Sequence, residues 1–485
     1  METNTLLSRL PLAFFLLLHF SCCFYNAIGS TPPVSAAQQN GRLALEIVIG
    51  GGSTPPGYPP ENGDCPPPPP PPCPPPPPPP RPPKMVPPHP PPRPPSPTPP
   101  LYVNPEIERS ARIIQRFGRN ILNDPKGVVK TWTGNKLCID KSKYVGFICY
   151  KGDSEPNSKF RLVGVDFNGN NFNTKPGRGP LLVQGFLENL KDTVFFHANS
   201  NNFTGAIPYN ISKLRQFYEL DLSNNKLVGA FPKPVLSATL LTFLDLRFNF
   251  LTGPIPPQVF KLDLDVLFLN NNGFTGNIPE NLGQTPVLFL TLANNKLTGP
   301  IPKSIGQTAI NLLEVLLLNN QLSGCLPYEI GFLNKTTIFD ASINKLTGPI
   351  PNSFGCLEEM QIMNFTFNQL YGAVPESLCA LDDLMSVDLR FNYFTQVGEE
   401  CRELIKKGIL DMSMNCILDL PNQRSAKECA AFFSVGRTCP DPSSLNYVPC
   451  KIHHRSNRQQ QTSHRVRKKA RSPSRAYEAL KGKHD

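Results

Sequence analysis

Histidine is scarce in this sequence of 485 residues: there are seven, and only His197 lies between residues 163 and 420, the most regular part of the chain. A Ser-His-Asp or Cys-His arrangement there would have to use this one side chain, and no nucleophile-elbow sequence accompanies it. Zinc-type Cys/His spacing, a P-loop and a kinase signature are also missing. We therefore expect no catalysis, no metal and no cofactor, and we interpret His197 as a strand surface residue.

Long apolar runs are missing too, with one exception near the N-terminus. Arg9 precedes an apolar run from Leu10 to Tyr25, and small residues follow it. This pattern is typical of a secretory signal, here residues 1–29. No other stretch approaches about 20 apolar residues, so the sequence predicts a soluble secreted product without a transmembrane segment. An uncleaved anchor is the alternative.

From about Val163 to Leu420 the chain repeats the template L-x-L-x-x-N-x-L-x-G-x-I-P about every 24 residues. The asparagines of the template are Asn170, Asn201, Asn225, Asn249, Asn272, Asn295, Asn320, Asn344, Asn368, Asn392 and Asn415. A period in this range with this pattern is the signature of leucine-rich repeats. We predict an α/β solenoid of about 10–11 repeats at residues 163–420, with a parallel β-sheet on its concave face.

Each letter of the template has a physical role. Residues five and three before each asparagine predict a short strand with one buried side, such as Leu220 and Leu222, and Leu227 points inward after the asparagine. The asparagine amide supplies two donors and an acceptor to turn backbone inside the stack. The glycine allows a sharp bend and the proline ends the strand. A single repeat cannot bury its own apolar edge, so the repeats must stack.

The open ends of a solenoid need covers. We assign residues 104–162 to an N-terminal cap that has a helical pattern from Glu106 to Asn123, followed by Trp132 and a predicted Cys138–Cys149 bridge. The apolar side of this helical pattern consists of Ile107, Ile114, Phe117 and Ile121. Residues 421–450 form the predicted Cys-containing C-terminal cap.

Both flanks differ in composition from the repeats. Residues 30–103 are predicted to be a disordered Pro-rich segment, since positions 66–100 hold most of the excess among 57 prolines. Cys65 and Cys73 would lie roughly 25 Å apart on a polyproline II helix, too far to pair with each other. They are either free thiols or cross-links to other chains. Residues 451–485 carry eleven Lys and Arg against two acids, and we predict a disordered basic tail that is either only solvated or attracts a polyanion.

Twelve of the 14 cysteines remain after removal of a signal, and in an oxidising compartment they predict disulfides. Cys356 and Cys379 stand at nearly equal offsets in adjacent repeats and form a plausible pair. Cys325 has no counterpart in the neighbouring repeats, so it is either free or paired outside its stack. Five more gather toward the C-terminal cap, and the sequence leaves their connectivity open: Cys401, Cys416, Cys429, Cys439 and Cys450.

Strand residues that point outward from the concave side are the candidate binding site. Four residues before each asparagine the column is acidic toward both ends and apolar between. We predict an exposed apolar group on this face, consisting of Phe243, Phe248, Phe268, Phe289 and Leu316. An apolar anchor with acidic flanks suits a basic peptide ligand. The candidate ligand-binding residues are Asp221, Asp245, Arg247, Phe268, Leu316, Asp340 and Asp388; the alternative is a surface that is merely solvated.

Four Asn-x-Ser/Thr sequons agree with secretion and predict N-glycosylation at Asn202, Asn210, Asn334 and Asn364. Asn364 belongs to the outward column of the sheet. A glycan there would close the C-terminal part of the binding face.

The helix, the single Trp, the Cys pair and the segment Tyr144–Tyr150 resemble a plant leucine-rich-repeat N-terminal cap. The segments Phe243–Pro256, Phe268–Gly283 and Leu317–Gly331 resemble the leucine-rich repeat extensin (LRX) proteins of plant cell walls. Residues 415–433 are similar to the Cys-containing region of that family. The resemblance covers roughly residues 105–440. It departs from the family after Cys450, where no Ser-Pro-rich, tyrosine-bearing extensin repeats follow.

The resemblance implies a secreted cell-wall protein that binds a peptide or protein ligand. The implied ligand is a small basic Cys-rich signalling peptide, and the implied role is in wall assembly and growth. In a plant wall the polyanion for the basic tail would be pectin, and we expect no nucleic acid. Two alternatives share these features. One is a binder of wall-degrading enzymes like the polygalacturonase inhibitors, and the other is a structural hydroxyproline-rich glycoprotein.

Overall fold

The structure, a computed structural model, describes residues 104–152, 159–174, 177, 179–308 and 311–450. The chain divides into two units at Pro92/Arg93, and every described residue belongs to the second unit. The predicted signal, the Pro-rich segment with its two cysteines and the basic tail lie outside the described residues. Within those residues, no helix combines the length and the apolar composition of a membrane span.

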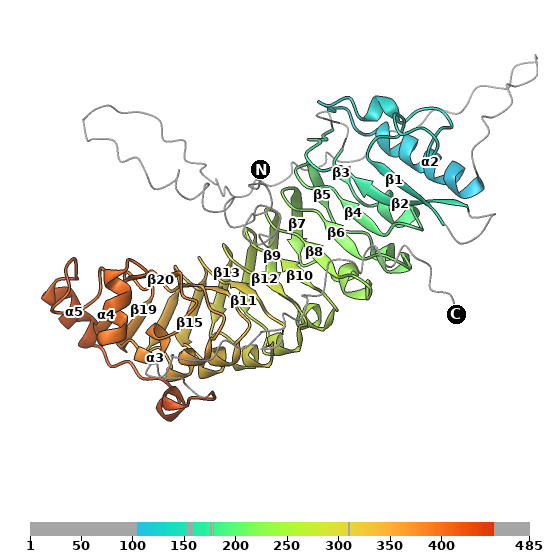
Figure 1. Cartoon of the computed structure of the whole chain (residues 1–485). Coiled ribbons are helices and arrows are strands. Elements are labelled where there is room, and N and C mark those ends of the chain that lie inside the picture. The colour runs from blue at the N-terminus through green and yellow to red at the C-terminus, as the bar shows by residue number, and fades with distance from the viewer. Residues whose placement is uncertain (1–103, 153–158, 175–176, 178, 309–310, 451–485) are drawn as a thin grey trace, which may run out of the picture. The chain divides into compact units, whose positions relative to one another are not determined.

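The repeats build one sheet of twelve strands, and a second sheet of ten strands runs along the same stack of coils (Figure 1). The larger sheet contains β1 Phe147–Lys151, β2 Phe160–Asp166, β4 Phe195–His197, β6 Glu219–Asp221, β8 Phe243–Asp245, β10 Val266–Phe268, β12 Phe289–Thr291, β14 Glu314–Leu316, β16 Ile338–Asp340, β18 Ile362–Asn364, β20 Ser386–Asp388 and β22 Leu410–Asp411. Apart from the antiparallel β1–β2 pair, each strand runs parallel to its neighbour in the next repeat. The predicted solenoid is therefore confirmed, with eleven repeat strands from β2 to β22.

The second sheet follows the turn of each repeat. Its strands are β3 Leu181–Leu182, β5 Phe203–Gly205, β7 Lys226–Ala230, β9 Phe250–Pro254, β11 Gly273–Asn277, β13 Lys296–Gly299, β15 Gln321–Cys325, β17 Lys345–Gly348, β19 Gln369–Ala373 and β21 Tyr393–Gln396. The template glycines all have positive φ, between 74° and 94°. At Gly348 a side chain would also collide with the sulfur atoms of Cys325 and Cys439. These positions therefore require glycine, as the template predicts.

Short helices close each coil on the side away from the larger sheet. The 3₁₀-helices are η1 Val129–Thr131, η2 Leu187–Asn189, η3 Tyr209–Lys213, η4 Lys233–Ser237, η5 Pro257–Lys261, η6 Leu282–Gln284, η7 Lys303–Thr308, η8 Tyr328–Phe332, η9 Asn352–Cys356 and η10 Pro442–Asn446. The α-helices are α2 Pro105–Gly118, α3 Glu376–Cys379, α4 Glu399–Lys406 and α5 Ala426–Phe433. Most repeat helices begin directly after a template proline, such as Pro256 before η5, because proline is tolerated where no backbone donor is needed.

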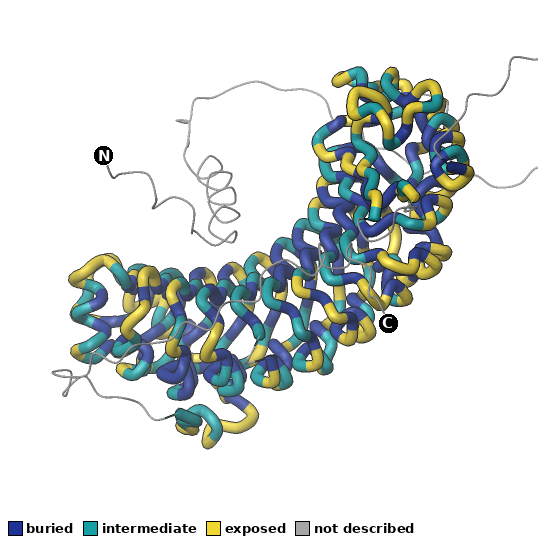
Figure 2. Tube along the Cα trace, turned by 45° about the vertical axis from the view of Figure 1, so that its right-hand side comes forward, coloured by how far each residue is buried: buried dark blue, intermediate teal, exposed yellow. Residues whose placement is uncertain are grey.

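The core follows the stack, and buried segments recur from coil to coil (Figure 2). Leu220, Leu244 and Leu267 pair in register on adjacent strands, and each is fully buried. Leu222 and Leu227 are buried as predicted. Burial of one such side chain stabilises the fold by about 1.5–3 kcal/mol, so the stability of the stack grows with each repeat added.

The template asparagines form a hydrogen-bonded ladder along the stack. The Asn249 amide nitrogen donates to the carbonyls of Leu246 and Arg247 in its own turn, at 3.1 and 3.2 Å, and to Leu222 of the preceding repeat at 2.9 Å. Its oxygen accepts from the Leu227 N–H at 2.9 Å. The same set recurs at Asn225, and each amide thus satisfies both its own turn and the one before it.

The residue before each ladder asparagine has a left-handed backbone, a feature that the template does not reveal. From Ser200 to Met414 these residues have φ between 51° and 58°. Asparagine tolerates this region, but a β-branched or bulky side chain pays about 1–2 kcal/mol for it. Ile343, Phe367 and Phe391 nevertheless occupy such positions, and the two phenyl rings stack with centroids 4.1 Å apart.

The N-terminal cap has the predicted parts with one correction. Helix α2 begins after the N-cap Asn104 and ends at Gly118, not at Asn123. Gly118 lies against Trp132, and a Cβ there would come within 3.0 Å of the indole. Ile121 is buried just beyond the end of the helix. Its spacing from Phe117 therefore predicted a buried side chain correctly, but it did not predict where the helix ends. The predicted boundary at 162/163 falls inside β2, which pairs with the cap strand β1 and with the repeat strand β4.

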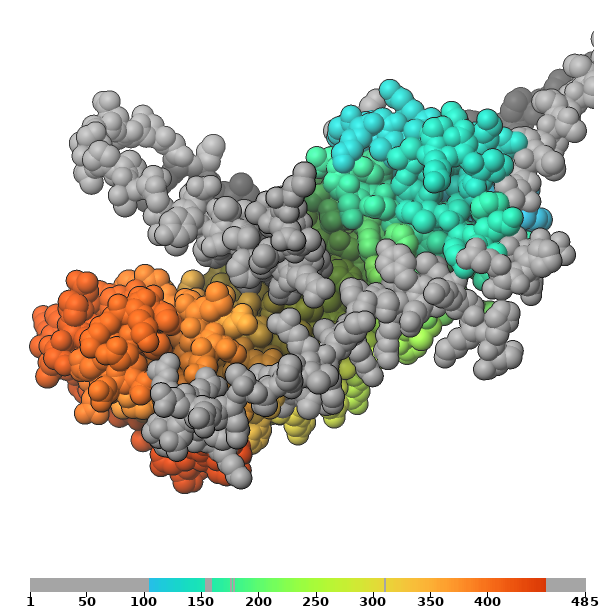
Figure 3. Space-filling model, viewed as in Figure 1, coloured from blue at the N-terminus to red at the C-terminus, as the bar shows by residue number. Residues whose placement is uncertain are grey.

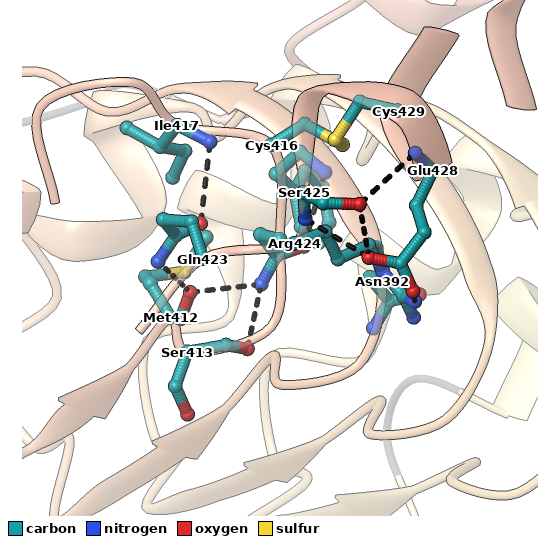
Figure 4. The surroundings of a disulfide bond; sticks show 12 residues. Asn392, Met412, Ser413, Cys416, Ile417, Gln423, Arg424, Ser425, Glu428 and Cys429 are labelled. Atoms are coloured by element: carbon teal, nitrogen blue, oxygen red, sulfur yellow. Dashed lines mark hydrogen bonds and ion pairs between the residues drawn. A yellow bond between two sulfur atoms is a disulfide. The ribbon is translucent and has the colours of Figure 1, made fainter. Parts of the chain in front are cut away.

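The C-terminal cap ends the asparagine ladder with a glutamine (Figure 4). Gln423 donates from Nε2 to the Met412 carbonyl at 3.0 Å and accepts from the Ile417 N–H at 3.2 Å. If another repeat followed Asn415, its template asparagine would form these two hydrogen bonds with Met412 and Ile417. Cys416–Cys429 ties this loop to α5, whose first turn is closed by a capping box between Ser425 and Glu428.

Five disulfides are present among the described cysteines, which fits an oxidising compartment. Cys138–Cys149 is as predicted. The Cys356–Cys379 prediction is wrong: Cys379 pairs with Cys401 of the next helix, and Cys356 pairs with Cys450. Cys325 pairs outside its stack, with Cys439. The segment after α5 is therefore fastened to the stack twice, once to β15 through Cys439 and once to η9 through Cys450.

Candidate functional site

The outward side of the larger sheet carries every residue predicted to bind a ligand. We call this surface the sheet face and define it as the residues six, four and two positions before each ladder asparagine. The predicted residues run from Asp221 on β6 to Asp388 on β20. Eight strands at about 4.8 Å spacing place the two ends roughly 34 Å apart, so they form an extended row and not one pocket.

Eight carboxylates and two guanidinium groups belong to the sheet face. The acids are Asp166, Glu219, Asp221, Asp245, Glu314, Asp340, Asp388 and Asp411, and the bases are Arg247 and Arg390. Several aspartates also fix their own turns: Asp221 accepts from the Ser223 N–H at 2.9 Å, and Asp340 accepts from the Ser342 N–H at 2.9 Å. These carboxylates are therefore held in place before any ligand arrives.

Asp245 and Phe268 are less exposed than the sequence suggested. The Asp245 side chain is 1 % exposed, with Arg247 Nε 2.9 Å from its Oδ2. The Arg247 guanidinium in turn lies 5.0 Å from the centroid of the Phe268 ring, which is 9 % exposed. Burial raises the pKa of Asp245, and Arg247 offsets part of that rise. Outward side chains on the same strand and on the next strand thus cover one another. A list of outward positions taken from the sequence does not show this.

The apolar centre of the sheet face lies further along than Phe268. Leu316 on β14 is half-buried, as are Phe289 on β12 and Ile362 on β18, and Ile338 on β16 is buried. Three of these four residues, Phe289, Ile338 and Ile362, stand six positions before a ladder asparagine. From this column only Phe243 and Phe289 were predicted to be exposed. Phe248 is exposed, but it occupies the left-handed turn after β8.

Glu314 stands inside this apolar centre. It pairs in register with Phe289 on one side and Ile338 on the other, and Leu316 follows it on the same face of β14. No ion pair to it occurs in the described part of the chain. Burial alone raises the pKa of Glu314 to about 7. One strand away, burial raises the pKa of Asp340 to about 6, against hydrogen bonds from Ser342 and Asn364.

We expect Glu314→Gln to stabilise the protein at pH 8 by about 1–2 kcal/mol and to leave stability unchanged near pH 4, after discounting for partial exposure. The raised pKa means that the folded state favours the protonated acid. Wild-type stability is therefore lost as the pH rises from the ordinary value of 4.5 through about 7. Thermal unfolding of both proteins across this range measures the difference. Exposed Glu358→Gln is the control for a lost charge, and a gain that is independent of pH would contradict the prediction.

The two ends of the sheet face carry paired charges. His197 Nε2 lies 2.8 Å from the Glu219 carboxylate. Burial lowers the pKa of His197, but the hydrogen bond and charge of Glu219, with Asp221 and Asp166, raise it overall. At the other end Arg390 binds Asp388 through Nη2 at 2.6 Å and reaches Asp411 at 3.5 Å. His197 is thus half-buried and paired rather than a free surface residue.

The four predicted glycosylation sites differ in accessibility. Asn210 and Asn334 are exposed, and Asn202 is half-buried with its amide 3.2 Å from the Phe172 carbonyl. Asn364 lies on the sheet face between Asp340, to which its amide donates at 3.1 Å, and Thr366, whose hydroxyl donates to it at 2.6 Å. Glycosylation remains a prediction at all four.

Among the described residues, no group of three or more His, Cys, Asp or Glu side chains is placed to hold a metal ion. What the sheet face does present is charge, apolar surface and fixed geometry. These are the properties of a binding surface.

The chain is similar to known leucine-rich repeat proteins. The Leucine Rich Repeat family model matches residues 240–262 and 263–285. Leucine-rich repeat extensin-like protein 7 of Arabidopsis thaliana is 49 % identical over 339 residues, covering 70 % of this chain and 75 % of that protein. Leucine-rich repeat extensin-like protein 2 of the same plant is 38 % identical over 239 residues, and the chain covers 25 % of its length.

Among solved structures, a plant ice-binding protein is similar in fold. It has a TM-score of 0.50 and 23 % identity, and the alignment covers 66 % of this chain and 98 % of that protein. This likeness concerns the fold alone.

Proposed function

This chain belongs to the leucine-rich repeat extensin-like family, and from that premise we propose that it is a secreted cell-wall protein whose sheet face binds a basic peptide or protein. The ligand class that fits best is a small basic Cys-rich signalling peptide, and the role is in wall assembly and growth. Binding, without catalysis, is the activity that the arrangement supports.

The observation that carries this proposal is the excess of fixed acids around an apolar centre. Burial raises the pKa of Asp245, Glu314 and Asp340 and so favours their neutral forms. The other five carboxylates of the sheet face still outnumber its two guanidinium groups and attract a basic ligand over a distance of about one Debye length, near 8 Å at physiological ionic strength. The half-buried Leu316, Phe289 and Ile362 then give the ligand an apolar anchor. Charge sets the rate and orientation of the encounter, and the apolar contact supplies much of the affinity.

Glu314 refines the kind of contact. A ligand side chain that brings a cation to Glu314 would also bury apolar surface against Phe289 and Ile338. Lysine and arginine do both, because their stems are apolar and their ends are charged. The secreted location is supported by the five disulfides and by the names of the relatives.

We expect Leu316→Arg to weaken binding of a basic Cys-rich peptide of the rapid-alkalinisation-factor type at least about tenfold, or 1.4 kcal/mol. The new guanidinium would occupy the apolar centre and repel a cationic ligand. Titration calorimetry of the purified full chain with the synthetic peptide gives the affinities. Leu240→Arg is the matched control, because Leu240 is 44 % exposed and lies outside the sheet face.

Equal loss of affinity in both variants, or none in Leu316→Arg, would contradict the assignment to the sheet face. Failure of the wild-type chain to bind the peptide would contradict the ligand class. Inhibition of a pectinase by the same protein would favour the inhibitor alternative. Retention in the wall through residues 60–100 alone would favour the structural one.

A further inference from the structure

Helix α2 of the N-terminal cap carries a row of arginines on the side opposite its buried face. Ile107, Ala111, Ile114 and Phe117 are buried against the first repeat. The exposed row consists of Arg109, Arg112, Arg116 and, at the C-cap, Arg119. Spacings of three, four and three residues keep these four side chains on one face of the helix.

This row does not help the helix to form. Like charges three or four residues apart destabilise an isolated helix by about 0.2–0.5 kcal/mol per pair, and the row contains three such pairs. Arg112 pairs with Glu108. In the part of the chain that the structure describes, no carboxylate forms an ion pair with Arg109, Arg116 or Arg119. The folded cap therefore keeps several guanidinium groups available to a partner.

Three of the arginines also border an open cavity of about 470 Å³ that the exposed side of α2 shares with the segment around η2. Arg109, Arg112 and Arg116 line it from the helix, and Gly185 and Asn189 line it from the segment around η2. The nearby acids are already engaged: Glu108 pairs with Arg112, and Glu188 accepts from the Gly185 N–H at 2.8 Å. The N-terminal cap, to which α2 belongs, is the blue-to-cyan end of the molecule in Figure 3.

We propose that this cavity and the arginine row bind a carboxylated, anionic polysaccharide. Guanidinium groups match carboxylates with two parallel N–H donors, and repeated carboxylates along a polymer match a repeated row of forks. Residues 109 to 119 extend about 15 Å along the helix axis, enough for several successive contacts.

The surroundings favour this polymer over other polyanions. No aromatic side chain lines the cavity, whereas single-stranded nucleic acids are held by stacking on aromatic rings. The disulfides indicate an oxidising compartment, which is where acidic polysaccharides occur. The row lies at the cap end of the stack and has the opposite charge to the sheet face, so the protein could hold a basic ligand and an anionic polymer on separate surfaces.

The test uses the full chain and a de-esterified galacturonate oligomer as the probe. Arg109→Gln/Arg116→Gln is expected to weaken binding roughly tenfold at low salt, because two exposed charge-assisted contacts are lost. The matched control is Arg161→Gln/Arg215→Gln, which removes the same charge from two exposed positions outside the cavity. Added salt should reduce the difference between wild type and the cavity variant.

Equal weakening of both double variants would show that net charge alone, not the cavity, holds the polymer and would overturn the proposal. So would unchanged binding of the cavity variant, or tighter cavity-dependent binding of single-stranded nucleic acid than of the oligomer. A fully methyl-esterified oligomer should bind poorly to the wild type and to both double variants. The basic peptide should still bind Arg109→Gln/Arg116→Gln, so this proposal and the one for the sheet face can fail independently.

Discussion

Replacing Asn249 with leucine is expected to lower the free energy of unfolding by about 4 kcal/mol, the largest effect we anticipate from a single substitution. Leucine fills a similar volume but leaves the carbonyls of Leu222 and Leu246 without the amide donor and the Leu227 N–H without its acceptor. Each buried polar group left unsatisfied costs about 1–3 kcal/mol, and relaxation of the turn recovers part of the sum. The damage spans two repeats because the ladder joins them.

Urea unfolding followed by far-ultraviolet circular dichroism measures this loss. Asn120→Leu is the control, since Asn120 is exposed after α2 and lies outside the ladder. A change below about 1 kcal/mol for Asn249→Leu would mean that the ladder contributes no more than an average surface contact.

Replacing both Cys325 and Cys439 with serine is expected to cost about 3 kcal/mol and to free the segment that follows α5. This disulfide closes a loop of 114 residues, and long loops gain the most from cross-linking in the chain-entropy account. Cys356–Cys450 closes an overlapping loop of 94 residues, so it retains part of the constraint.

Hydrogen exchange of residues 434–450 gives a local measure of this effect alongside global unfolding. Exchange there should rise in the Cys325→Ser/Cys439→Ser variant and stay unchanged in Cys138→Ser/Cys149→Ser, whose bridge closes 11 residues at the other end of the stack. Unchanged exchange after α5 would show that η10 and its contacts hold the segment without the bridge.

Several features could be predicted from the sequence because residues close together in the chain determine them. Leu220, Leu222 and Leu227 were assigned correctly to the core, since burial within a repeat follows the two-residue period of a strand and the fixed offset from the asparagine. The Cys138–Cys149 bridge could be predicted in the same way, because its two cysteines are 11 residues apart. The end of α2 was not, because the apolar spacing continues to Ile121, which is buried although it lies beyond the helix.

The candidate site divides in the same way. The acidic column and its apolar gap follow from the repeat period, but whether Asp245 is open to a ligand depends on Arg247 and on Phe268 of the next strand. Phe289 and Ile338 stand at the same offset as Glu314 in the adjacent repeats, so the repeat period places them beside it. The burial that raises the pKa of Glu314 became apparent only in the stacked strands.

By itself the sequence determined the coil, the ladder and the direction in which each strand side chain points, because these depend on contacts within one repeat or between a repeat and its copy. Only the tertiary structure decided which cysteines join, how the outward charges cover one another and how Gln423 completes the ladder. Those outcomes depend on where distant segments meet once the coils are stacked, and a periodic sequence offers many equivalent places for them to meet.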